Sequence, residues 1–242
     1  MDYQTKVSSS TGYDEQLRQY MLRVYNYMAA GLAITGLVSY MLLQMTAVFG
    51  DKGELVGLTS LGYAMYGGNM IYLFALSPVI VLWFGFSPNM SASRAQTTFW
   101  VLAVLMAFSI APLLIVFTGA SVVRVFLITS TLFGLLSLYG YVTKRDLTEF
   151  RAFLTVGVIG LFIASLINLW FQSTSMMYII CYIGIPLMLG CIAYETQNLK
   201  NRFNAFDSEE LMKRNAILGA LSLYIFFINL FKFLLIILGN RR

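Results

Sequence analysis

The sequence predicts an all-α integral membrane protein with seven transmembrane helices. Of its 242 residues, 59% are hydrophobic and 11% are charged, whereas soluble domains carry about 25% charged residues. The chain also holds seven apolar runs, each near the length that a helix needs to cross ~30 Å of hydrocarbon. These runs are uniformly apolar, whereas the strands of a membrane barrel alternate apolar and polar residues. The pattern therefore favours a helical bundle.

The chain starts with a polar tail, residues 1–24, which we expect to be cytoplasmic. We expect disorder at residues 1–12 and a helix after Asp14. A cleavable signal peptide would place its apolar core sooner, so the first run is expected to remain as a membrane anchor. Residues 25–242 then form a single seven-helix membrane domain.

The apolar runs follow in order, separated by short polar connections. They are Tyr27–Phe49, Asn69–Phe86, Thr97–Phe117, Val122–Val142, Phe153–Phe171, Met176–Tyr194 and Ala216–Leu238. Small residues allow helices to approach closely in membranes. We expect this role for four glycines, namely Gly31, Gly36, Gly157 and Gly160.

The Lys and Arg residues predict the orientation, because they gather on the cytoplasmic side of membrane proteins. With a cytoplasmic N-terminus, eleven of the 16 lie on that side, four lie on the other, and Lys232 falls within the last run. Seven crossings would place Arg241 and Arg242 outside. The alternative is a last run that re-enters, but its 23 apolar residues are long enough to cross, so we predict crossing.

Several function classes are excluded by composition. The chain has no histidine, so a Ser-His-Asp or Cys-His arrangement is impossible. No zinc-protease or phosphate-loop motif occurs, and no apolar run contains an aspartate. We therefore expect neither enzymatic activity nor a cofactor. The net charge of +5 is spread over short loops without a basic stripe, so nucleic acid is not an expected partner.

A few polar residues lie in or beside the apolar runs. Glu195 is the one acidic residue that lies where an apolar run ends. A charge at the bilayer centre costs roughly 2.5–3.5 kcal/mol on insertion scales, so Glu195 is either functional or located at the headgroup level. Asn168 and Asn229 are expected to hydrogen-bond across helices. Lys232 either extends to the interface or turns inward to a carboxylate.

Four segments resemble the Bax inhibitor-1 family, and the resemblance covers nearly the whole chain. They are TSTLFGLLSLYGYVTKRDL at 129–147, FIASLINLW at 162–170, LGCIAYETQNLK at 189–200 and ALSLYIFFINLFKFLL at 220–235. The resemblance implies a bundle whose last helix is surrounded by the other six, in a bacterial inner membrane. It also implies a set of structural motif residues, namely Tyr141, Lys144, Arg145, Asp146 and Asn168.

The family resemblance further implies a pH-sensitive calcium leak, with Ca²⁺ as the transported ion. In that picture, one aspartate on helix six and one on helix seven share a proton and close the pore. Here Glu195 keeps the first acid, whereas Phe226 replaces the second. Three hypotheses remain: Glu195 acts alone, Glu195 pairs with Lys232, or the pore is closed and the protein works by binding others. If a metal ion binds, Glu195 is its candidate ligand.

A second functional class follows from the same resemblance. Some bacterial members associate with a membrane-bound quality-control protease and modulate it in a stress response. The alternative function is therefore that of a non-transporting interaction protein. Its contact surfaces would be residues 1–24 and 195–215. The sequence gives no oligomeric state.

Overall fold

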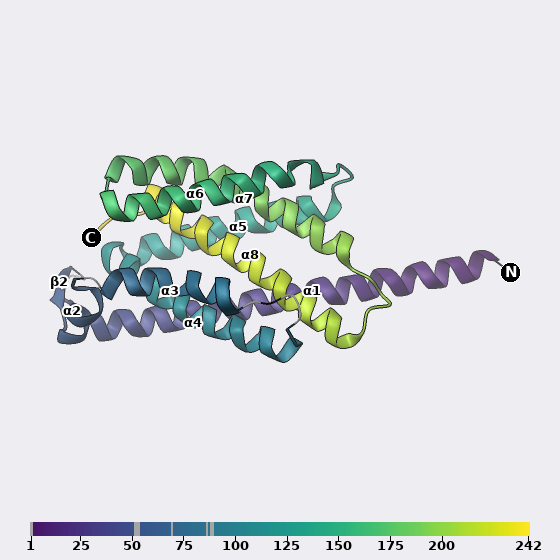
Figure 1. Cartoon of the computed structure of the whole chain (residues 1–242), viewed down its shortest axis with the longest axis horizontal. Helices are drawn as coiled ribbons and strands as arrows, with labels where there is room; N and C mark the ends of the chain where they lie inside the picture. The colour runs from purple at the N-terminus through teal and green to yellow at the C-terminus, as the bar shows by residue number, and fades with distance from the viewer. Residues whose placement is uncertain (1, 51–53, 69, 86, 88–89) are drawn as a thin grey trace.

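A computed structural model describes the backbone of residues 2–50, 54–68, 70–85, 87 and 90–242, with side chains from residue 13 onward (Figure 1). The elements in order are α1 (Asp2–Thr46), β1 (Ala47–Phe49), β2 (Leu55–Leu58), α2 (Ser60–Tyr66), α3 (Met70–Gly85), α4 (Ala92–Val116), α5 (Gly119–Val142), the 3₁₀ helix η1 (Leu147–Phe150), α6 (Arg151–Phe171), α7 (Thr174–Arg202) and α8 (Glu209–Leu238).

The helices confirm the predicted all-α membrane architecture. Six of the described helices are long and apolar enough to cross a membrane. The count reaches seven when α2 and α3, which meet at a bend of 61°, are taken as one broken span. The last five predicted runs lie in the helices α4 to α8, apart from Phe117, which follows the end of α4, and α7 continues beyond its run to Arg202.

Two local predictions are wrong. Residues 2–12, where we expected disorder, belong to α1, which starts at Asp2, and Met1 lies outside the described residues. The end of the first run is a strand: Ala47 pairs with Leu58 in a two-stranded antiparallel sheet, with an irregularity between Val48 and Phe49. Apolar residues at the end of a run fit a helix or a strand equally well by hydropathy, so only the pairing partner decides between them.

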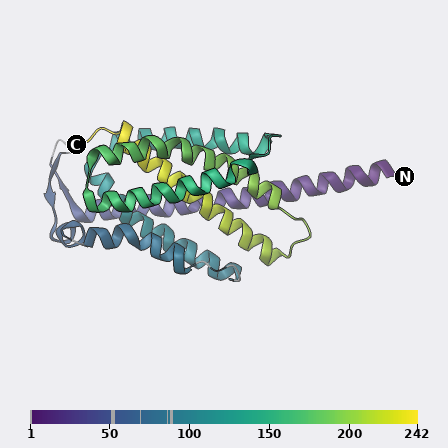
Figure 2. The same ribbon diagram turned by 45° about the horizontal axis from the view of Figure 1, so that its top comes forward.

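Helix α8 lies at the centre of the bundle, as the resemblance implied. It packs against α1, α4, α5 and α7, while α3 packs on α4 and α6 packs on α7. Figures 1 and 2 show α8 crossing the molecule between the α6–α7 pair and the α3–α4 pair. Four helices thus pack directly on α8, and α3 and α6 lie outside them.

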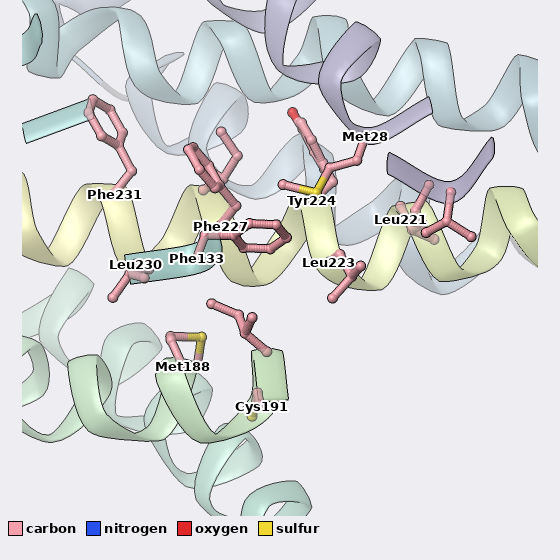
Figure 3. Close-up of a cluster of buried hydrophobic side chains, with 14 of the residues drawn as sticks. Met28, Phe133, Met188, Cys191, Leu221, Leu223, Tyr224, Phe227, Leu230 and Phe231 are labelled. Atoms are coloured by element: carbon pink, nitrogen blue, oxygen red, sulfur yellow. The ribbon is translucent and has the colours of Figure 1, made fainter. Parts of the chain in front are cut away.

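Side chains of α8 reach in opposite directions into the core (Figure 3). Tyr224, which is fully buried, points toward Met28 of α1, whereas Leu223 and Leu230 point toward α7 near Met188. A helix that is buried on several sides must be apolar on all of them. This explains why the last run shows no polar stripe.

Two of the four glycines allow the close contacts predicted for them. A Cβ atom on Gly31 would lie 2.7 Å from Cζ of Phe99, and one on Gly157 would lie 2.7 Å from Cδ1 of Leu187. The prediction is wrong for Gly36 and Gly160, where an added Cβ would meet nothing within 4 Å. Composition identifies small residues but not the direction in which they face.

The last helix crosses the bundle, as predicted. At one end, which we call the tail end, the rings of Tyr20 and Phe203 lie 5.3 Å apart. At the other end the backbone N–H of Arg242 donates to the carbonyl of Val116 at 2.9 Å. The N-terminal segment and the C-terminus therefore lie at opposite ends of the molecule (Figure 1). That the tail end is cytoplasmic stays a prediction.

Candidate functional site

Glu195 lies near the end of α7, at the tail end of the bundle. Its side chain is half-buried, and its Oε2 accepts a hydrogen bond from Nδ2 of Asn198 at 3.2 Å. Asn198 is three residues further along, a spacing that brings both side chains to the same face of the helix. The carboxylate thus has one fixed partner and keeps further acceptor positions.

Glu195 lines a cavity of about 190 Å³ at the tail end. Walls of this cavity come from α7, the first half of α8, the connection between them and Tyr20 of α1. Its polar lining residues include Glu195, Arg202, Asn204, Asp207, Asn215 and Ser222. A cavity of this size with polar lining residues has room for several water molecules. Among the described residues, no group of three or more His, Cys, Asp or Glu side chains is placed to hold a metal ion.

The packing of α7 against α8 fixes how deep Phe226, the residue in place of the family's second acid, lies in the bundle. The helices are antiparallel, since Leu199 packs on Gly219 at one end and Phe233 packs on Gly184 at the other. The cavity lining on α8 extends as far as Ser222. Phe226 follows one turn later, roughly 6 Å further along α8 into the bundle, where its half-buried ring packs on the core.

Asn229 and Lys232, the two polar residues further along α8, lie away from Glu195. Lys232 is half-buried and lies ten residues past Ser222, about 15 Å along the helix. The hypothesis that it pairs with Glu195 is therefore wrong, because the antiparallel register separates them. Asn229 donates from Nδ2 to the carbonyl of Ile225 at 2.9 Å. It bonds back to its own helix, not across helices as predicted, because that carbonyl is one turn away.

Asn168 also serves a local role that differs from the prediction. Its Oδ1 accepts from the backbone N–H of Ser173 at 3.1 Å, and its carbonyl accepts from that of Gln172 at 2.7 Å. Gln172 has a φ of 51°, in the left-handed region that ends many helices. Asn168 thus holds the tight turn between α6 and α7 instead of bridging two helices.

The YGYVTKRDL block is clamped by α7. Gln197 donates from Nε2 to the carbonyl of Arg145 at 2.7 Å and accepts at Oε1 from the N–H of Leu147 at 2.8 Å. Lys200 donates from Nζ to the carbonyl of Tyr141 at 2.8 Å and lies 4.9 Å from the centre of its ring. Two of the segments that carry the resemblance therefore bind each other, beside the candidate site.

Asp146 caps the short helix η1 that follows this block. Its Oδ1 accepts from the backbone N–H of Thr148 at 2.9 Å. Hydrogen bonds from the Thr148 side chain and backbone lower the pKa of the Asp146 carboxyl, because they favour its charged form. The side chains of Lys144 and Arg145 are exposed. Arg145 and Asp146 thus act through backbone and capping bonds.

A chain of hydroxyl groups that the sequence did not predict joins three helices next to Glu195. Tyr25 of α1 lies 2.6 Å from the Oγ of Ser137 on α5, which lies 3.1 Å from the Oγ1 of Thr196 on α7. Thr196 in turn donates to the carbonyl of Ile192. Ser and Thr inside apolar runs were the available signal, but their pairing depends on helix register.

Comparison with known proteins places this architecture among bacterial membrane proteins. Residues 17–242 match the family model described as inhibitor of apoptosis-promoting Bax1. An uncharacterized protein of Rickettsia prowazekii is 39% identical, over 98% of this chain and 96% of its own length. The inner membrane protein YbhL of Escherichia coli is 37% identical over 93% of each chain. An uncharacterized membrane protein of Streptococcus pyogenes is 29% identical, over 94% and 95% respectively.

Proposed function

The chain belongs to the Bax inhibitor-1 family of multi-pass membrane proteins, and we propose that it passes cations, calcium among them, across a bacterial inner membrane. In this proposal the path opens at the tail end through the Glu195 cavity, and the protein has no enzymatic role. One observation carries the proposal: a carboxylate lies in a partly polar cavity at the point where α7 enters the apolar bundle.

The chemistry of the cavity supports entry of a hard cation. Calcium prefers carboxylate, amide, carbonyl and water oxygens. The cavity offers two carboxylates, those of Glu195 and Asp207, with amide oxygens of Asn204 and Asn215. Arg202 lines the same cavity and opposes positive charge. Its presence favours weak, transient occupancy, which conduction requires.

We propose that Phe226 closes the path in this conformation. Its ring occupies the turn that follows the cavity on α8, where the family resemblance places a second acid. Apolar constrictions gate pores by excluding water. A gate of this kind has a phenyl ring in place of the second acid, so no proton is shared between two carboxylates at this point of the path.

Calcium flux into liposomes tests this proposal. The purified chain is reconstituted, and uptake is followed with an enclosed calcium dye between pH 5 and 8. Glu195→Gln is expected to lower the flux or change its pH dependence, and Phe226→Ala to raise it. Glu149→Gln, at an exposed acid of η1, is the matched control. Flux traces of Glu195→Gln that coincide with those of the control would refute the proposal.

The interaction function stays a second proposal, supported by the projection of α1. Figure 1 shows the first part of α1 extending away from the other helices. A free helical segment is suited to bind the groove of another protein. Deletion of residues 2–12 leaves Tyr20 and its contact with Phe203 intact. Loss of a co-purifying membrane protease on this deletion, with calcium flux absent from the intact chain, would favour this function over the first.

A further inference from the structure

A groove of about 920 Å³ lies between α1 and α5 at the tail end of the bundle. Its lining runs along α1 from Asp14 to Tyr25 and along α5 from Phe133 to Tyr141. The stretch on α1 covers about 16 Å at 1.5 Å per residue. Ligand pockets in proteins measure roughly 300–1,000 Å³, so the groove is large enough for an extended small molecule.

The inner part of the groove is an apolar slot. Met21, Leu22 and Phe133 form its walls, and Leu138 flanks it. Gly134 leaves the slot open, since an added Cβ there would meet nothing within 4 Å. Around a membrane-spanning bundle, apolar surface of this kind faces hydrocarbon. The slot therefore matches an acyl chain.

The mouth of the groove carries both signs of charge. Asp14, Glu15 and Arg18 line it, all with exposed side chains. Arg18 donates from Nη1 to Oε2 of Glu15 at 3.2 Å, which holds its guanidinium at the mouth. A guanidinium has five N–H donors, so it can bind a carboxylate and a phosphate together. The two acids favour a cationic group beside that phosphate.

We infer that this groove binds one molecule of phosphatidylethanolamine. An acyl chain fills the slot, the phosphate contacts Arg18, and the ammonium contacts Asp14 and Glu15. A primary ammonium donates three hydrogen bonds, whereas the trimethylammonium of phosphatidylcholine has no N–H group. Phosphatidylglycerol has no cation to offer the two carboxylates. The charges at the mouth thus select the zwitterionic lipid with a primary amine.

Native mass spectrometry of the purified full chain tests the site. The chain is mixed in mild detergent with each of the three lipids, and the bound copies are counted. We expect one phosphatidylethanolamine per chain, preferred about tenfold over phosphatidylcholine, as one to two charge-assisted hydrogen bonds imply. Gly134→Trp fills the slot and is expected to lower binding about tenfold or more. The matched control is Gly160→Trp on α6, where the glycine is exposed and equally open.

A second variant keeps the test independent of the slot. The double substitution Asp14→Asn with Glu15→Gln changes exposed side chains only and is expected to abolish the preference for phosphatidylethanolamine over phosphatidylcholine. Three results would overturn the inference. Equal binding by Gly134→Trp and Gly160→Trp indicates ordinary lipid around the bundle. Equal affinity of the unmodified chain for the first two lipids removes the headgroup argument. A bound polypeptide that is lost in Gly134→Trp assigns the groove to a protein partner.

Discussion

The hydroxyl pair of Tyr224 and Thr35 gives the sharpest stability prediction. Tyr224 lies at the centre of the bundle, fully buried, and its phenol lies 2.7 Å from Oγ1 of Thr35. Thr35 is also placed to donate to the carbonyls of Gly31 at 2.9 Å and Ala103 at 2.8 Å. Because its single proton goes to a carbonyl, the Tyr224 hydroxyl must be the donor of the shared bond.

This assignment makes the two single substitutions unequal. Tyr224→Phe removes the donor and leaves Thr35 still bonded to a carbonyl, so the cost is that of one hydrogen bond in a membrane bundle, roughly 0.6–1.7 kcal/mol. Thr35→Val keeps its volume but leaves the buried phenol without an acceptor, which costs about 1–3 kcal/mol. Once Thr35 is valine, removing the phenol as well should cost nothing further and recover part of that loss.

A double-mutant cycle measures these quantities. The free energy of unfolding is obtained by titrating the purified chain with denaturing detergent, followed by circular dichroism. We expect Thr35→Val to be the more destabilising single change, and the double variant to be no less stable than Thr35→Val alone. A Tyr224→Phe cost equal to or above that of Thr35→Val would refute the assigned donor. Additive costs would show that the two hydroxyls are not coupled.

Three further predictions concern the tail end of the bundle. Gly140→Ala should destabilise the protein strongly, because its Cβ would collide with the backbone carbonyl of Ala193. Gly134→Ala on the same helix meets open space and should be neutral or stabilise the protein by up to about 1 kcal/mol. Thermal unfolding of both variants in detergent compares their stabilities. Gln197→Ala removes two hydrogen bonds to the 143–147 loop and should lower the free energy of unfolding by about 1–3 kcal/mol. Amide exchange in that loop should become faster, and unchanged exchange would contradict the clamp. The pKa of Asp146 is lowered in the folded chain, so its capping contribution is present above the unfolded value of about 3.9 and is lost as pH falls through the folded pKa. The protection factors of the η1 amides, which compare exchange with the unfolded rate at the same pH, should fall over that acid range, and Asp146→Asn, which caps without titrating, should abolish the dependence.

The candidate site was predictable in its identity but not in its surroundings. Glu195 could be selected from the sequence, since it is the acid at the end of an apolar run. Its cavity could not, because the lining comes from α1, α7 and α8, whose residues are far apart in the chain. Lys232 shares an apolar run with Ser222, yet only the antiparallel register shows that about 15 Å of helix lies between its position and the cavity.

The sequence by itself determined which segments enter the membrane, because transfer into hydrocarbon depends on each segment's own composition. It also determined the exclusion of histidine-based chemistry. Only the tertiary structure decided which faces of the helices meet. Tyr25, Ser137 and Thr196 form one hydroxyl chain across sequence separations of 112 and 59 residues. All faces of these helices are apolar enough for lipid or core, so hydropathy does not distinguish them, and packing and hydrogen-bond geometry set the register.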